Sequence, residues 1–136
     1  MRTVVVTAIG SFSADIVIRK CRENGIRVIG CDVYPREWIA DAGNVDVFYQ
    51  VPYATDTERF MEAMMTICRK EGAEAVIPLT DAEIDVFNLH RAEFGEMDVI
   101  LCMSDRACIG LCRDKMELYQ YLEAHMEGIA IPTRRL

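Results

Sequence analysis

The sequence predicts a doubly wound α/β domain: a Rossmann-like parallel sheet of about five strands with helices on both faces. Short runs rich in β-branched residues alternate with longer stretches whose apolar residues recur at helical spacing. Strands separated by whole helices cannot form hairpins, so right-handed crossovers must connect parallel strands. Ligands of such sheets bind at the carboxyl ends of the strands.

The elements follow one another along the chain. The run at 3–8 (TVVVTA) is continuously apolar and β-branched, which is typical of a strand buried on both faces. The third strand alternates more than the first two, so we expect it nearer an edge. Strands are predicted at 3–8, 26–31, 46–51, 73–79 and 98–103, and helices at 14–24, 57–71, 82–94, 104–112 and 114–126.

Composition excludes several classes of protein. A net charge of −7 repels a phosphate backbone, so no nucleic acid partner is expected. No apolar run reaches the ~20 residues of a membrane helix, and the first residues lack a signal peptide, so we expect a cytoplasmic protein without a membrane partner. The six cysteines form no C-x-x-C motif and are expected to be reduced, with Cys31 and Cys102 buried.

The first strand ends in a turn with a single glycine, Gly10, followed by Ser11 and Phe12. A dinucleotide fingerprint needs three glycines, and the bulk of Phe12 also disfavours the usual binding of nicotinamide cofactors. The turn could meet an anion with its amides, or Gly10 could serve only the dihedral angles of a tight turn. Asp32 ends the second strand, where it could hold a ribose, although a loop-capping or surface role is favoured.

Thr80, Asp81 and Glu83 directly follow the fourth strand, at the edge of the sheet that carries ligands. Two carboxylates and a hydroxyl could hold an amine, a magnesium ion or another polar group of a substrate. Capping of the following helix is the favoured interpretation, with Thr80 or Asp81 at its start and Glu83 near its positive end. The two roles are compatible.

Lys115 lies near the start of the last helix, where a positive charge opposes the helix dipole. A phosphate contact would explain this position, and so would a solvated lysine. The methionines of the 57–71 helix, Met61, Met64 and Met65, are interpreted as core residues.

Five segments in series resemble the amino-terminal part of ATP-grasp ligases related to the large subunit of carbamoyl phosphate synthase. They are VVVTAIGSFSADIV, VIGCDVYP, FYQVPYATD, VIPLTDAEIDVF and CRDKMELYQYLEAHMEGIAIPT, and together they cover nearly the whole chain. The resemblance implies a pre-ATP-grasp domain at 1–112. It also implies that 113–136 forms a helix and the start of a linker into an ATP-grasp domain.

Such ligases use ATP and magnesium to activate a carboxylate or bicarbonate as an acyl phosphate, which then reacts with a nucleophile, often an amine. The resemblance implies that Lys115 contacts the ATP phosphates. It places five residues on the substrate side of the cleft: Gly10, Ser11, Thr80, Asp81 and Glu83.

The resemblance also predicts what lies outside this chain. The two subdomains that clasp ATP, and the acidic residues that hold magnesium, would follow in the same polypeptide or come from a partner chain. We therefore expect this chain alone to be inactive, without catalytic residues or metal ligands and without tight binding of ATP or Mg²⁺. A small carboxylate substrate is expected, and a homodimer is possible, with the methionine-rich helix as one contact.

Two alternatives stay open at this point. One is a binding module for NAD(P) or another nucleotide, and the other is a non-catalytic interaction domain. The architecture of the sheet cannot separate them, because a fold alone does not determine function.

Overall fold

The computed structural model describes residues 2–126 and 128–134 of the 136-residue chain. The chain divides into a first unit up to Met103 and a second unit from Ser104. The first unit contains the sheet and its covering helices, and the second contains two further helices. Each unit is described here by itself.

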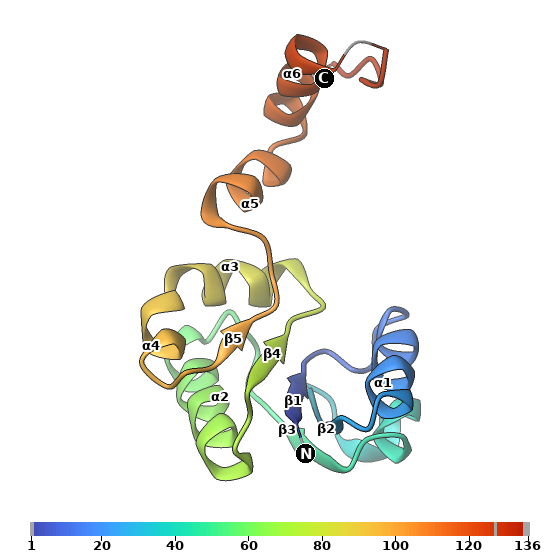
Figure 1. Cartoon of the computed structure of the whole chain (residues 1–136), viewed down its shortest axis with the longest axis vertical. Helices are drawn as coiled ribbons and strands as arrows, with labels where there is room; N and C mark the ends of the chain where they lie inside the picture. The colour runs from blue at the N-terminus through green and yellow to red at the C-terminus, as the bar shows by residue number, and fades with distance from the viewer. Residues whose placement is uncertain (1, 127, 135–136) are drawn as a thin grey trace. The chain divides into compact units, whose positions relative to one another are not determined.

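A five-stranded parallel sheet lies at the centre of the first unit, in the order β3-β2-β1-β4-β5 (Figure 1). The predicted Rossmann-like fold is therefore confirmed, and so is the edge position of the third strand. Strands β2 and β3 lie on one side of β1, and β4 and β5 lie on the other. The strand order therefore reverses between β1 and β4, which is the topological switch point of the sheet. The strands are β1 (Thr3–Val6), β2 (Arg27–Asp32), β3 (Val47–Gln50), β4 (Ala75–Ile77) and β5 (Ile100–Leu101).

Helices cover both faces of this sheet, as predicted (Figure 1). One face carries α1 together with two short 3-10 helices, and the other carries α2, α3 and α4. The elements are α1 (Ala14–Glu23), η1 (Arg36–Trp38), η2 (Ala40–Gly43), α2 (Thr57–Glu71), α3 (Asp81–Leu89) and α4 (Arg91–Gly95).

The alternation of side chains along each strand divides the core into two layers. Val5 and Ile29 point into the layer beneath α2, α3 and α4, where three buried phenylalanines pack together (Phe60, Phe87 and Phe94). Val4, Val6 and Val28 point into the other layer, against α1. Burial on both faces explains why the first two strands are apolar without alternation.

The methionines of α2 belong to the core, as predicted. Met61 and Met64 are buried in the layer that contains the phenylalanines, and Met65 packs against it. Whether this helix also takes part in a dimer contact stays a prediction.

Three local predictions were wrong. The predicted helix at 82–94 is two helices, because the backbone leaves helical geometry at His90 (φ −108°, ψ 26°). The fifth strand starts later than expected, since Asp98 adopts a left-handed conformation (φ 55°) that no strand allows. Cys102, predicted to be buried, is exposed because the short strand ends just before it.

The second unit consists of α5 (Arg106–Arg113) and α6 (Lys115–His125), which contact each other. Asp105 caps α5, since its carboxylate accepts the Cys108 amide at 2.8 Å. Asp114 caps α6 in the same way. Neither helix contributes a buried side chain. In the described part of the chain, no helix is long and apolar enough to cross a bilayer.

Candidate functional site

The segment after β1 lies between the ends of its two neighbouring strands. The Thr7 amide donates to the carbonyl of Ile77 at the end of β4, and the Ile9 amide donates to the carbonyl of Cys31 in β2. Ala8, between them, takes a left-handed conformation (φ 48°), which is uncommon for a residue other than glycine. The chain thus turns sharply at the switch point, where sheets of this kind bind ligands.

Gly10 lies in a crowded part of this turn. Its amide donates to the Asp32 carboxylate at 2.8 Å. A Cβ atom on Gly10 would lie 2.8 Å from Cδ1 of Ile39 and 3.1 Å from Oδ2 of Asp32. Its φ is not positive, so the interpretation that the turn needs Gly10 for its dihedral angles was wrong. A side chain at this position would crowd Ile39 and Asp32.

Asp32 caps two loops from a buried position. Only 5% of its surface is exposed, so the alternative of a surface aspartate was wrong. One carboxylate oxygen accepts the Gly10 amide, and the other accepts the Tyr34 amide at 3.0 Å. The loop-capping interpretation is therefore confirmed.

Glu83 joins the two strands that flank the switch point. Its Oε2 atom accepts a hydrogen bond from the Thr7 hydroxyl after β1 and another from the Thr80 hydroxyl after β4, each at 2.8 Å. Thr80 is the N-cap residue of α3, but its hydroxyl makes no bond to the helix backbone. The Thr80 hydroxyl therefore contacts the carboxylate of Glu83, which is buried, and not the backbone of the helix.

Burial raises the pKa of Glu83 above its usual value of 4.5, because the charged form loses its hydration. Hydrogen bonds from Thr80 and Thr7 partly oppose this shift, and the nearby negative charge of Asp32 adds to it. Glu83 is thus a carboxylate that is held in place by two hydroxyls and that takes up a proton more readily than an exposed glutamate.

Two adjoining cavities open at this edge of the sheet, and together we call them the crevice. The larger has a volume of about 480 Å³ and the smaller about 280 Å³. Ala8, Asp32, Val33 and Thr80 line both. The larger is completed by Ile9, Gly10, Ser11, Tyr34, Trp38, Ile39, Ala40 and Asp41, and the smaller by Tyr53, Ala54, Ala82 and Glu83.

The crevice brings together four of the five residues predicted for the substrate side. Gly10, Ser11 and Thr80 line the larger cavity, and Thr80 and Glu83 line the smaller. Asp81 lines neither, and it is exposed as the first residue of α3. Whether these residues contact a substrate stays a prediction.

Sequence reasoning missed the aromatic and acidic side of the crevice. Tyr34, Trp38 and Asp41 come from the segment after β2, and Tyr53 comes from the loop after β3. In a doubly wound sheet every loop that follows a strand reaches the same edge. That rule was the available signal, since each of these residues follows a predicted strand.

Lys115 belongs to the second unit, at the first position of α6. Its ammonium group donates to the carbonyl of Cys112 in the last turn of α5, at 3.3 Å. A positive charge is unfavourable at the amino end of α6 but favourable at the carboxyl end of α5. The contact with α5 therefore explains why a lysine is tolerated at position 115. The side chain is exposed, and its contact with ATP stays a prediction.

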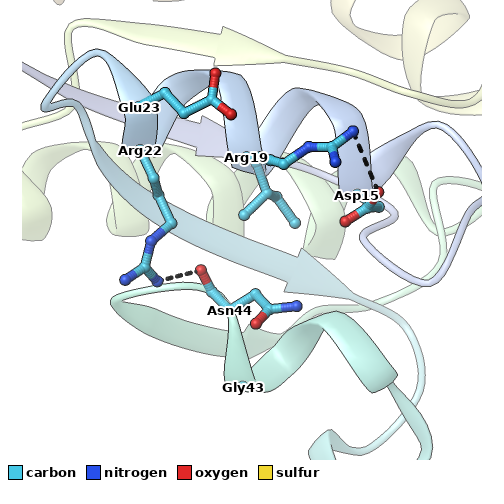
Figure 2. A pocket seen from close by; sticks show the side chains of 7 residues that line it. Asp15, Arg19, Arg22, Glu23, Gly43 and Asn44 are labelled. Carbon is cyan, nitrogen blue, oxygen red and sulfur yellow. Dashed lines mark hydrogen bonds and ion pairs between the residues drawn. The ribbon is translucent and has the colours of Figure 1, made fainter.

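Another cavity, of about 430 Å³, lies between α1 and η2, away from the strand ends (Figure 2). Arg19 pairs with Asp15 at 3.9 Å, and Arg22 donates to the Asn44 carbonyl, as the dashed lines in Figure 2 show. The two arginines therefore have partners on the protein, and Glu23 adds further negative charge. This arrangement does not indicate a ligand.

Comparison with solved structures supports the same fold. The biotin carboxylase subunit of a pyruvate carboxylase superposes with a TM-score of 0.64 and 19% identity, covering 91% of this chain and 28% of that chain. The biotin carboxylase domain of Hydrogenobacter thermophilus 2-oxoglutarate carboxylase gives 0.64 and 19%, covering 89% and 27%. The complete multifunctional pyruvate carboxylase of Rhizobium etli gives 0.65 and 14%, covering 99% and 13%.

These identities are low and show the fold alone. The chain spans between 13% and 28% of the length of these three structures. A comparison with curated protein sequences finds no match.

The family model of the PylC-like N-terminal domain matches residues 4–102, which include all five strands and both layers of the core. The resemblance to the pre-ATP-grasp domain of ATP-grasp ligases is thereby confirmed. This chain belongs to the PylC-like N-terminal domain family.

Proposed function

We propose that this chain is the substrate-side domain of an ATP-dependent carboxylate–amine ligase, or of a ligase that resembles carbamoyl phosphate synthase. The enzyme acts through an acyl phosphate. The subdomains that clasp ATP follow in the same polypeptide or belong to a partner chain, and this domain alone is inactive. The observation that carries the proposal is the polar crevice at the switch point of the sheet. This sheet belongs to a domain whose family resembles the pre-ATP-grasp domain of ATP-grasp ligases.

The charges support different ligands for the crevice and for Lys115. Among the residues that the structure describes, its lining includes Asp32, Asp41 and Glu83 and no lysine, arginine or histidine. Because a triphosphate is repelled by such a surface, the crevice does not suit ATP. Lys115 is an exposed cation in the second unit, and its chemistry fits a phosphate contact.

Magnesium accompanies ATP in this proposal. Among the described residues, no three or more histidine, cysteine, aspartate or glutamate side chains form a group that fits a metal ion. We therefore assign the magnesium ligands to the ATP-clasping subdomains. Bound Mg²⁺ would supply charge neutralisation for the phosphates.

Binding of NAD(P) is the runner-up, and no observation favours it over the ligase. The first turn has one glycine, and the oxygens of Asp32 already accept the Gly10 and Tyr34 amides. A pyrophosphate at this turn would also face the negative charge of the crevice. The interaction module likewise has no specific feature in its support.

The test uses the complete gene product that carries this domain. We expect release of ADP that depends on a carboxylate and an amine together. Lys115→Ala should slow this release about tenfold or more, because a charged hydrogen bond to phosphate is lost. Lys20→Ala is the matched control, since Lys20 is exposed in α1 and, among the described residues, its ammonium pairs with Glu23 alone; it should change the rate less than twofold.

Two results would contradict the proposal, and a third would contradict only the role of Lys115. A gene that ends after Leu136 without a neighbouring ATP-grasp partner would favour the interaction module. Micromolar binding of NAD by the chain would favour the nucleotide module. An unchanged rate with Lys115→Ala would remove the role of Lys115 while leaving the ligase assignment in place.

A further inference from the structure

The crevice combines negative charge with exposed aromatic surface. Asp32 and Asp41 line its larger cavity, and Glu83 lines the smaller. Neither lining contains a basic residue, and no ion pair involves these three carboxylates in the part of the chain that the structure describes. A positively charged ligand would supply the missing counter-charge.

Asp41 is the carboxylate best suited to meet a ligand. It lies in η2, partly exposed, and its Oδ1 atom accepts the Asn44 side-chain amide at 2.8 Å. Its Oδ2 atom has no protein partner among the described residues. Asp32, in contrast, is buried and uses both oxygens to cap loops.

Two aromatic rings form the wall of the larger cavity. Tyr34 and Trp38 stack with ring centroids 6.0 Å apart and an angle of 29° between the planes. Trp38 is 72% exposed, which is high for the largest aromatic residue, although it lines a cavity. The face of an indole ring attracts a cation more strongly than the face of any other aromatic side chain.

The dimensions of the crevice suit a small molecule. Cavities of about 480 and 280 Å³ lie at the small end of the range for ligand pockets. Tyr53, which borders the smaller cavity, shares a hydrogen bond with Tyr34 that raises the pKa of its hydroxyl. This contact links the aromatic walls of the two cavities.

We propose that the crevice binds the ammonium group of a small organic amine or amino acid. The Asp41 carboxylate pairs with the ammonium, and the Trp38 ring covers it. The proposal rests on the proposed ligase function and adds the substrate class, since it makes this domain the binding site of the amine-bearing substrate.

Trp38 is the only tryptophan of the chain, so its fluorescence reports on the crevice directly. The probe is n-butylammonium. Butyrate serves as a control of similar size with the opposite charge, and 1-butanol as a control without charge. Each is titrated into the 136-residue chain. We expect a saturable change in emission with n-butylammonium alone. The Asp41→Asn variant should weaken this binding about tenfold, because an ion pair becomes a neutral contact.

Glu96→Gln is the matched control. It removes one negative charge from an exposed position at the end of α4, outside both cavities, and should change the affinity less than twofold. Asn at position 41 keeps the oxygen that accepts the Asn44 amide, so the local fold is preserved. An unchanged circular dichroism spectrum checks this.

The ammonium proposal is wrong if n-butylammonium gives no saturable change, if 1-butanol binds equally well, or if Glu96→Gln weakens binding as much as Asp41→Asn. In each case, ADP release by the complete gene product with a carboxylate and an amine would still support the ligase assignment. Micromolar binding of NAD would instead overturn the ligase function itself.

Discussion

Glu83 holds the switch point together through one carboxylate oxygen. Two hydroxyls from different strands donate to that oxygen, and the side chain is buried. Removing it with Glu83→Ala leaves the Thr7 and Thr80 hydroxyls without their acceptor. The expected loss is about 1–3 kcal/mol of unfolding free energy, the usual penalty for a buried polar group without a partner.

Glu83→Gln gives a sharper test, because the amide oxygen keeps the role of acceptor while the charge disappears. The pKa of Glu83 is raised in the folded state, so the native protein binds its proton more tightly than the unfolded chain does. The stability that this residue contributes is complete below the usual value of 4.5 and is lost as the pH rises through the folded pKa.

The measurement is urea unfolding of both proteins at a series of pH values from about 4 to 8. The stability of the natural protein relative to Glu83→Gln should fall as the pH rises across this range. A difference that is constant, or that grows with pH, would show that the carboxylate is not destabilised by burial.

At the scale of elements, Glu71 ties the end of α2 to two strands. Its carboxylate accepts the Arg27 guanidinium of β2 at 2.6 Å and the Tyr49 hydroxyl of β3 at 2.5 Å. The hydrogen bond from Tyr49, with that from Arg27, lowers the pKa of Glu71 below its usual value of 4.5. The charged form is therefore the stabilising one.

The expected pH dependence is opposite to that of Glu83. The contribution of Glu71 is present above pH 4.5 and is lost as the pH falls through the lowered folded pKa. Glu71→Gln should destabilise the protein at neutral pH and have less effect in acid. The same urea titrations measure both variants, and equal losses for Glu71→Gln at neutral and acid pH would contradict the assignment.

The elements were largely predictable because burial leaves a periodic pattern in the sequence. The helix at 57–71 was predicted with the bounds that the structure gives, since Gly72 adopts the left-handed conformation that ends it. The break at His90 has no glycine or proline signal. Several polar residues precede α5 and α6, and the cap is the one whose side chain accepts a helix amide. Asp105 and Asp114 do so in the structure, but the sequence pattern does not show it.

The site was predictable only in part. Thr80 and Glu83 lie just after a strand, and that position is readable from the sequence. The pairing of Glu83 with Thr7 joins residues 76 apart, and no local pattern contains such a contact. The same holds for Asp41 and Trp38, whose place in the crevice depends on how two short 3-10 helices fold back toward the first turn.

At the scale of the whole molecule, the two units differ in what stabilises them. Every buried apolar residue of the described chain lies in the first unit, and neither α5 nor α6 contributes one. Hydrophobic burial supplies most of the free energy of folding. We therefore expect the first unit to be the cooperative unit of unfolding.

A chain truncated after Met103 should fold with a urea midpoint close to that of the whole chain. In hydrogen exchange of the whole chain, the amides of β1 and β2 should exchange only on global unfolding, whereas those of α5 and α6 exchange through local opening. Loss of the cooperative transition on truncation would show that the second unit contributes to the core.

The most direct test of the central claim is to map which ligand reaches the carboxyl edge of the sheet. Amide chemical shifts of the isotope-labelled chain would be recorded with n-butylammonium, ATP and NAD in turn. We expect the amine to shift Gly10, Ser11, Thr80 and the Trp38 indole in a saturable manner, and the two nucleotides to leave these signals unchanged. Saturable shifts of the Gly10 and Ser11 amides by micromolar NAD, without a response to the amine, would contradict the account.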